Sequence, residues 1–284
     1  MNRTHLSRPL ALRPPALIVF AAGLLGLVAV LAAFFVSAGA AKTAGPKPTV
    51  VLVHGAWADG SGWNGVVQRL QREGYTVDVP PNPLRGVASD SAYLAAFLKT
   101  VTGPIVLVGH SYGGAVITNA ATGDPDVKAL VYINAFVPDQ GESVLQLASA
   151  QPGSDLGGDP TKVFNLVQYP GAPAGDFDLY VKPSLFPDAF ANDLPDKLGA
   201  VLAAGQRPLT LSAAAEPSGA PAWKTIPSWY LVGTADHVIP PAEQRFMATR
   251  AHAHTVEVKA SHLSMVSRPG DVTKLILEAA QSVH

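Results

Sequence analysis

The sequence predicts an α/β fold, in which a mostly parallel sheet is flanked by helices and a helical cap is inserted before the penultimate strand. Strand and helix patterns alternate between Thr49 and Asn134, which is typical of a parallel sheet with helices on both faces. The first predicted strand, residues 50–53, is a continuous apolar run, as expected of a strand buried on both sides. After Pro138 the alternation stops, and it resumes at Trp229, so an insertion separates two parts of the sheet.

The composition limits the class of protein. The chain has 284 residues, of which 48% are hydrophobic, enough for one large domain with an appendage. Its formal net charge is −1, so no basic face for nucleic acid is expected. The absence of cysteine excludes disulfides, thiolate metal sites and a cysteine nucleophile. No grouping of His, Asp and Glu has the spacing of a zinc site, so we expect neither a metal nor another cofactor.

The N-terminal segment is predicted to direct export. Residues 1–15 contain arginines but no acidic residue, and residues 16–36 are apolar or glycine throughout. This stretch exceeds the ~7–15 residues of a signal-peptide core and reaches the ~20 residues of a membrane span, yet Ala38-Gly39-Ala40 resembles a cleavage site. Residues 1–41 are therefore either a cleaved signal peptide or an N-terminal membrane anchor. The remainder would be secreted, periplasmic or anchored to the outer face of the cytoplasmic membrane.

A linker at residues 42–48 precedes the predicted domain, residues 49–284. The first half of this domain alternates between apolar runs of strand length and segments with helical spacing. We expect, in order, a strand at 50–53, a helix at 63–73, a strand at 75–79, a helix at 91–101, a strand at 105–108, a helix at 115–121 and a strand at 127–134.

The insertion, about residues 139–222, is rich in Pro, Gly, Ala and Asp and contains weakly amphipathic pieces. We interpret it as a largely helical cap rather than a disordered segment, because it contains many aromatic residues. After it we expect a strand at 229–232, a helix at 241–250, a strand at 255–258 and a closing helix at 272–280.

The segment Gly109-His110-Ser111-Tyr112-Gly113 has the Gly-x-Ser-x-Gly pattern of a nucleophile elbow. Such a short pattern is weak evidence by itself. It gains weight here because a buried strand precedes it and a helix follows it, which is the context that the elbow requires. We therefore predict that Ser111 projects from a strained turn as a nucleophile.

A serine nucleophile needs a base, and the base needs a group that holds its tautomer. His262 follows the strand at 255–258 and Asp236 follows the strand at 229–232, so both lie at carboxyl ends of parallel strands, where open α/β sheets bind ligands. We predict that His262 is the base and Asp236 the acid, with Asp139 as the competing acid.

Stabilising a tetrahedral intermediate requires two N–H donors aimed at the developing oxyanion. We assign these to the backbone of Tyr112, which follows the nucleophile, and of Ala56, in the loop after the first strand. His54 is expected to order that loop by hydrogen bonding, and His110 to pack beneath the elbow.

Together these motifs resemble the α/β-hydrolase superfamily, and within it a bacterial esterase-like branch related to plant methylesterases and hydroxynitrile lyases. The resemblance runs from about Thr49 to Val283. It implies a cofactor-free hydrolase with the triad and oxyanion hole given above. The matching segments are residues 51–57, 109–114, 233–240 and 261–269.

Three positions separate the branches of this superfamily. Leu263 and Gly55 stand where hydroxynitrile lyases of this type carry a lysine and a threonine, so the lyase activity is disfavoured. Ser111 stands where dehalogenases and epoxide hydrolases use an aspartate. We therefore expect a serine hydrolase that cleaves a small, mostly apolar carboxylic ester. A lactonase, a perhydrolase, a cofactor-free dioxygenase or a non-catalytic ligand-binding homologue stays open.

The expected partner is a small-molecule ester, with no nucleic acid, and with a membrane only through the N-terminal segment. No oligomeric state follows from the sequence. Aromatic residues of the cap and of the loop after the first strand are candidates for substrate binding, although packing of the cap onto the body competes with that role for each of them. The candidates are Trp57, Phe164, Phe186, Phe190 and Trp223.

Overall fold

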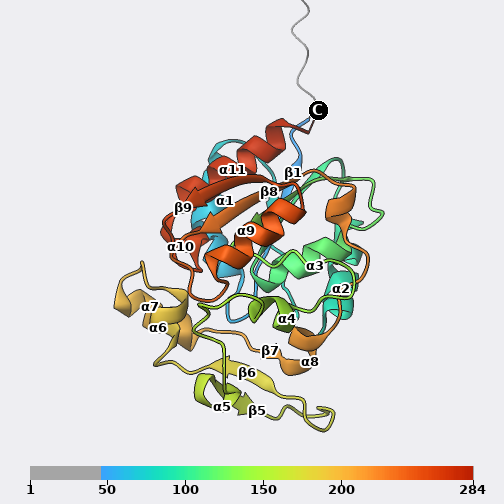
Figure 1. Cartoon of the computed structure of the whole chain (residues 1–284). Coiled ribbons are helices and arrows are strands. Elements are labelled where there is room, and N and C mark those ends of the chain that lie inside the picture. Colours follow the sequence, from blue (N-terminus) through green and yellow to red (C-terminus); the bar gives the residue numbers. More distant parts are fainter. Residues whose placement is uncertain (1–45, 284) are drawn as a thin grey trace, which may run out of the picture. The chain divides into compact units, whose positions relative to one another are not determined.

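The computed structural model describes residues 46–283 and has a central six-stranded sheet (Figure 1). Every strand pairing in this sheet is parallel, and the strand order is β2-β1-β3-β4-β8-β9. The predicted α/β architecture is therefore confirmed. The strands are β1 (Thr49–Val53), β2 (Val77–Asp78), β3 (Ile105–His110), β4 (Val127–Ile133), β8 (Ser228–Gly233) and β9 (His254–Val258).

Helices cover both faces of the sheet. On one face α1, α10 and α11 pack against one another, and on the other α2 and α3 form a pair next to α9 (Figure 1). The four central strands are almost completely buried between these layers, which explains their continuous apolar sequences. The helices are α1 (Asn64–Arg72), α2 (Val87–Leu98), α3 (Tyr112–Ala120), α9 (Pro241–Arg250), α10 (Ser264–Ser267) and α11 (Pro269–Gln281), with a 3₁₀ turn η1 at Gly60–Trp63.

The insertion between β4 and β8 is not wholly helical, which corrects the expectation of a helical cap. It contains a three-stranded antiparallel sheet, ordered β5-β6-β7, in addition to short helices. Its elements are α4 (Val144–Ala148), α5 (Pro160–Val163), β5 (Phe164–Val167), β6 (Asp178–Val181), α6 (Phe186–Phe190), α7 (Asp196–Ala204), β7 (Leu209–Thr210), α8 (Leu211–Ala215) and η2 (Ala222–Lys224).

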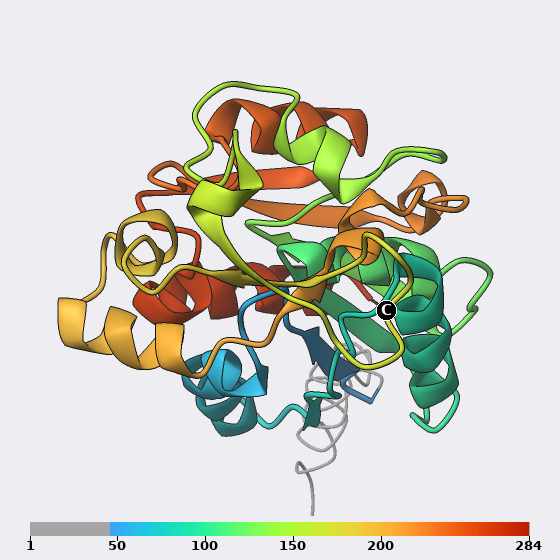
Figure 2. The ribbon, with the colours of Figure 1, turned by 90° about the horizontal axis from the view of Figure 1, so that it is seen from below.

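Two short runs in the insertion have residues that favour a strand over a helix. Residues 164–167 and 178–181 contain aromatic and β-branched residues, and the Pro- and Gly-containing stretch between them allows the chain to turn back. Phe164 pairs with Val181 in the resulting ladder. Figure 2 shows these strands, in yellow and green, crossing the end of the main sheet.

The predicted export segment at residues 16–36 lies outside the described residues. Within residues 46–283, no helix has both the length and the apolar character needed to cross a membrane.

Candidate active site

The turn between β3 and α3 holds Ser111 in a strained backbone conformation. Its φ of 53° lies in the left-handed region, which non-glycine residues rarely occupy and which is common at functional sites. The turn is tight, because a Cβ on Gly113 would lie 2.7 Å from the carbonyl oxygen of Val53 in β1. This glycine therefore lets α3 approach the sheet directly behind the serine.

The predicted acid and base form a buried pair. His262 Nδ1 lies 2.9 Å from Asp236 Oδ2, and neither side chain is exposed to solvent. The other carboxylate oxygen, Oδ1, accepts hydrogen bonds from the backbone N–H groups of Val238 and Ile239. A carboxylate fixed in this way holds the neighbouring imidazole with its proton on Nδ1, leaving Nε2 free to accept one.

His262 Nε2 is buried and has no hydrogen-bond partner among the described residues. No hydrogen bond joins it to Ser111 within that part of the chain, and catalytic contacts of this kind are often long before substrate binds. Two rings pack around this imidazole. The Phe190 ring meets it edge-on with centroids 5.1 Å apart, and the His110 ring lies 4.8 Å away.

His110 packs under the elbow and contacts the loop of the predicted base. Its side chain is fully buried, and its Nε2 lies 2.9 Å from the carbonyl oxygen of His262. Burial lowers the pKa of His110 well below its ordinary value, so the ring is neutral near neutral pH. A neutral imidazole with its proton on Nε2 donates to this carbonyl and anchors the loop.

The two predicted oxyanion donors, Ala56 and Tyr112, both line the cavity that contains Ser111. Neither backbone N–H has a hydrogen-bond partner within residues 46–283. His54 orders the first loop: its Nδ1 lies 2.9 Å from the Gly55 carbonyl oxygen, while its Nε2 accepts from the Asn82 N–H at 3.1 Å. Burial lowers the pKa of His54, which favours the neutral tautomer that these two contacts need.

Further contacts tie both oxyanion loops to their surroundings. The Trp57 indole donates to the carbonyl oxygen of Leu179 in β6 at 2.7 Å, and the Trp57 N–H donates to Arg207 O at 2.8 Å. The Tyr112 hydroxyl donates to the buried Asp90 carboxylate at 2.9 Å. The first loop is therefore anchored to the cap and the second to α2.

A cavity of about 510 Å³ lies between the elbow and the cap and includes Ser111 in its wall. Two predicted substrate-binding residues line it, Trp57 and Phe164, whose rings stack with centroids 5.5 Å apart. Among residues 46–283, no charged side chain lines this cavity. The other large apolar residues in the wall are Phe136, Val144, Leu145, Leu156, Leu166, Phe177, Leu179, Leu209, Leu211 and Val238.

Three predicted substrate-binding residues do not line this cavity. Phe186 and Phe190 are fully buried and stack on each other with centroids 4.6 Å apart, which packs α6 against the loop of His262. The Trp223 indole donates to the carbonyl oxygen of Pro138 at 2.9 Å. Phe186 and Phe190 thus pack the cap onto the loop after β9, and Trp223 joins the two ends of the insertion. Composition cannot distinguish such positions from a pocket wall.

Asp139, the competing acid, does not contact the predicted base. Its carboxylate pairs with Lys224 at 2.5 Å on the surface of the molecule. Side chains that the sequence reasoning missed surround Asp236 instead: Asn134 and Gln244 each donate to its Oδ2, at 2.9 and 2.8 Å. For Asn134, the sequence did contain a signal: a polar residue directly follows an apolar strand, at the end of the sheet where the site was predicted.

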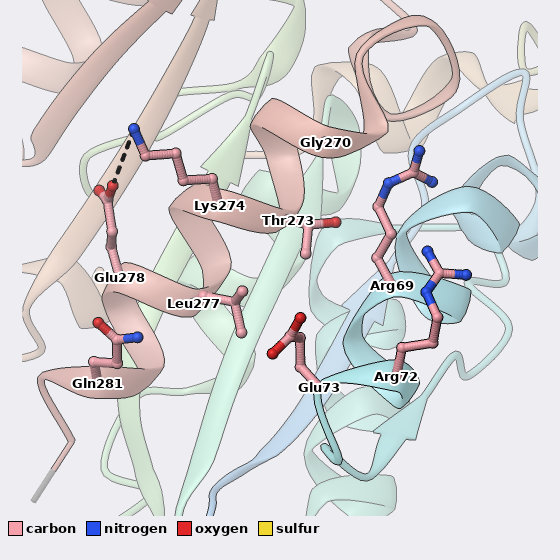
Figure 3. A pocket seen from close by; sticks show the side chains of 9 residues that line it. All are labelled: Arg69, Arg72, Glu73, Gly270, Thr273, Lys274, Leu277, Glu278 and Gln281. Carbon is pink, nitrogen blue, oxygen red and sulfur yellow. Dashed lines mark ion pairs between the residues drawn. The ribbon is translucent and has the colours of Figure 1, made fainter.

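A second hollow, of about 440 Å³, lies between α1 and α11, and its lining differs in kind (Figure 3). Charged side chains from both helices surround it, including Arg69, Arg72, Glu73, Lys274 and Glu278. Within residues 46–283 no group of three or more His, Asp or Glu side chains is arranged to hold a metal ion.

Comparison with known proteins shows what the chain is similar to. Residues 50–275 match the model of a family described as the alpha/beta hydrolase family. A carbendazim hydrolyzing esterase from Nocardioides sp. (strain SG-4G) is 36% identical over 110 residues, which cover 34% of this chain and 46% of that one. A chloroplastic protein of Arabidopsis thaliana, named as a methylesterase, is 27% identical over 251 residues, covering 81% of this chain and 56% of that one. The chain thus spans about half the length of these two relatives.

A solved structure supports the fold. The pyrethroid hydrolase from Sphingobium faniae JZ-2 superposes with a TM-score of 0.66 at 24% identity, covering 83% of this chain and 98% of that one. The superposition thus spans most of the chain and supports the same overall fold.

Proposed function

The chain belongs to the alpha/beta hydrolase family, and on this basis we propose that it hydrolyses carboxylic esters through an acyl-enzyme formed on Ser111. Esterases among its relatives support hydrolysis of esters in general. The observation that carries the serine mechanism is the buried pair of His262 and Asp236, joined at 2.9 Å, with His262 Nε2 left without a partner among the described residues.

The proposed reaction follows from these positions. Ser111 Oγ attacks the ester carbonyl while His262 Nε2 takes its proton, and Asp236 stabilises the imidazolium that forms. The N–H groups of Ala56 and Tyr112 stabilise the negative charge on the former carbonyl oxygen. The imidazolium then protonates the departing alcohol, and water attacks the acyl-enzyme by the same steps in reverse roles, releasing the acid and free Ser111.

The cavity supports a neutral, apolar substrate. The described residues place no charged side chain in its wall, and its volume of about 510 Å³ lies in the range of ~300–1,000 Å³ that suits drug-sized ligands. We therefore propose an ester whose acyl or alcohol part is apolar and larger than a two-carbon group. The substrates named for the relatives, carbendazim and pyrethroids, are not assigned to this chain.

A fluorophosphonate probe and a series of p-nitrophenyl esters test the proposal on the purified full chain. We expect one equivalent of probe on Ser111, located by peptide mass spectrometry, and turnover of the esters that the probe abolishes. Turnover that continues after complete labelling would contradict the serine mechanism. A protein that binds esters without labelling or turnover would be the non-catalytic ligand-binding homologue.

We also propose that residues 16–36 direct export, because the stretch is apolar throughout and follows arginines without acidic residues. The mass of the mature chain recovered from a bacterial host distinguishes a cleaved signal peptide from a retained anchor. Recovery of the full-length chain from the cytosol would contradict export.

A further inference from the structure

We propose that Asn134 is a positioning residue that holds Asp236 and the loop of His262 in one arrangement. The proposal rests on the function proposed above, since it concerns the same pair. One buried amide contacts three segments: its Nδ2 donates to Asp236 Oδ2 at 2.9 Å and to the Ser261 carbonyl oxygen at 3.2 Å, and its Oδ1 accepts from Ser264 Oγ at 2.6 Å.

The backbone at the end of β4 directs this side chain across the sheet. The Asn134 N–H still bonds to Leu231 O in β8 at 3.0 Å, so the residue continues the strand pairing. Its φ of 44° is left-handed, a conformation that asparagine tolerates better than most residues. A Cβ on Gly233, in β8, would lie 2.0 Å from Asn134 Nδ2, so the neighbouring strand leaves room for this amide only because a glycine stands there.

The contacts lie on both sides of the predicted base. Ser261 precedes His262, and Ser264 begins α10 two residues after it. Because one rigid amide plane makes all of these contacts, a displacement of the histidine loop relative to Asp236 would break at least one of them. In a fully buried environment an unpaired polar group is unfavourable, so the arrangement resists such displacement.

The Asn134 amide also donates a hydrogen bond to the Asp236 carboxylate. Oδ2 receives hydrogen bonds from Asn134 and from Gln244 Nε2 in addition to its contact with His262. Donors on this oxygen stabilise the ionised carboxylate and fix its rotation, so that one lone pair stays directed at His262 Nδ1. Asn134 thus acts on the reaction through Asp236 and His262, without contacting substrate.

The test compares Asn134→Ala, Asn134→Asp and Ser264→Ala with wild type in the full chain. For Asn134→Ala we expect kcat to fall about 10–100-fold with KM unchanged, because small misplacements of a catalytic group have effects of this size. Asn134→Asp keeps the shape and the acceptor for Ser264 but places a second carboxylate against Asp236. It should therefore lose at least as much activity as the alanine variant.

Coupling and a matched control complete the design. Ser264 is expected to act through Asn134, so Ser264→Ala should lower kcat a few-fold in wild type and have no further effect in Asn134→Ala. As a control, Asn119→Ala removes a different, partly buried asparagine, which lies in α3 and donates to Ser218 Oγ. This variant should keep kcat within about twofold of the wild-type value. Active-site titration with the fluorophosphonate gives the fraction of folded enzyme in each sample.

Three results would overturn the proposal. Rate losses that match the loss of titratable Ser111 would show that Asn134 serves folding alone. An Asn134→Asp variant more active than Asn134→Ala would show that shape matters and the donor does not. Independent, additive effects of the Asn134 and Ser264 variants would contradict the coupling. Failure of the proposed function itself is distinguishable, because wild type would then not react with the probe.

Discussion

Two of the hollows in the described part of the chain, residues 46–283, are similar in size but differ in their linings. The cavity at Ser111, about 510 Å³, has an apolar wall contributed mostly by the insertion and completed by residues that follow β1, β3 and β8, whereas the groove between α1 and α11, about 440 Å³, is lined largely by charged and polar residues of those two helices and of their ends. Volume alone therefore does not identify a site. What separates the two is that strained backbone, free N–H donors and an acid–base pair gather beside the first.

The contrast has an electrostatic consequence. Beside the Ser111 cavity, Asp236 and His110 are buried and hydrogen-bonded, so each acts in a medium of low dielectric and with a fixed direction. In the groove, Lys274 and Glu278 lie 4.0 Å apart on exposed parts of α11, where solvent screens the pair. Charges of that kind hold no substrate in a defined pose.

The largest expected effect concerns the nucleophile. Ser111→Ala should lower kcat by about 10⁶-fold, because removing a triad serine leaves only binding and oxyanion stabilisation. Ester turnover at matched protein concentration measures it, with Lys274→Ala in the groove as the control that keeps wild-type activity. A serine variant with wild-type turnover would move the reaction away from this cavity.

The next effect separates a cavity wall from cap packing. Phe164 lines the cavity, so Phe164→Ala should shift the preference toward longer acyl chains by about 10-fold in relative kcat/KM. Phe186 is fully buried against Phe190, so Phe186→Ala should lower the free energy of unfolding by about 3–5 kcal/mol and leave the chain-length profile unchanged. A p-nitrophenyl ester series and urea unfolding measure both. If Phe186→Ala changed the chain-length preference and Phe164→Ala only lowered stability, Phe186 would be the wall residue and Phe164 the packing residue.

A smaller effect compares a buried with an exposed carboxyl group. Glu243 is buried and its carboxyl oxygens have no hydrogen-bond partner among the described residues, and burial raises its pKa above the ordinary 4.5. The folded chain therefore binds this proton more tightly than the unfolded chain. The resulting stabilisation is fully present below the unfolded pKa and is lost as pH rises through the folded pKa.

Glu243→Gln removes this titration. Relative to the variant, wild type should lose stability between about pH 4 and about pH 7, measured by urea unfolding at both values. Glu278→Gln, on the exposed face of α11, should show no such change. Parallel curves for wild type and Glu243→Gln would mean that the carboxyl group is solvated in the folded state.

The smallest effects are expected in the groove. Arg72→Ala and Lys274→Ala should change the free energy of unfolding by less than about 0.5 kcal/mol and leave kcat/KM within twofold, as is usual for surface substitutions away from special contacts. Urea unfolding and ester kinetics check both. A loss of activity beyond twofold would show that this face influences the distant cavity.

The four central strands of the main sheet were predictable because they are mostly apolar runs separated by clear turns. Ser111, Asp236 and His262 could be placed at one edge because parallel strands end on the same side. The cap was less predictable. Its strands β5 and β6 have only four residues each, too few for a clear alternating pattern, and they are stabilised by pairing with each other.

The residues missed around the site share one property. Asn134 and Gln244 reach Asp236 from elements distant in the sequence, so no local spacing connects them to it. The position of Phe186, Phe190 and Trp223 outside the wall of the Ser111 cavity was unpredictable for a related reason, because an aromatic side chain that packs the cap and one that lines a cavity have the same composition signal. Both questions depend on long-range packing.

The placement of the insertion also bears on how the chain folds. β4 and β8 are neighbours in the sheet, but residues 134–227 separate them, whereas β1 to β4 are joined by shorter connections. Contacts between residues distant in sequence form slowly, because the intervening chain must first lose its conformational freedom. Asp236 and His262 both follow β8, so the reactive centre is completed after the first half of the sheet. On refolding from urea, we expect far-UV circular dichroism to recover before Ser111 regains reactivity toward the fluorophosphonate, and simultaneous recovery would mean that both halves of the sheet fold as one unit.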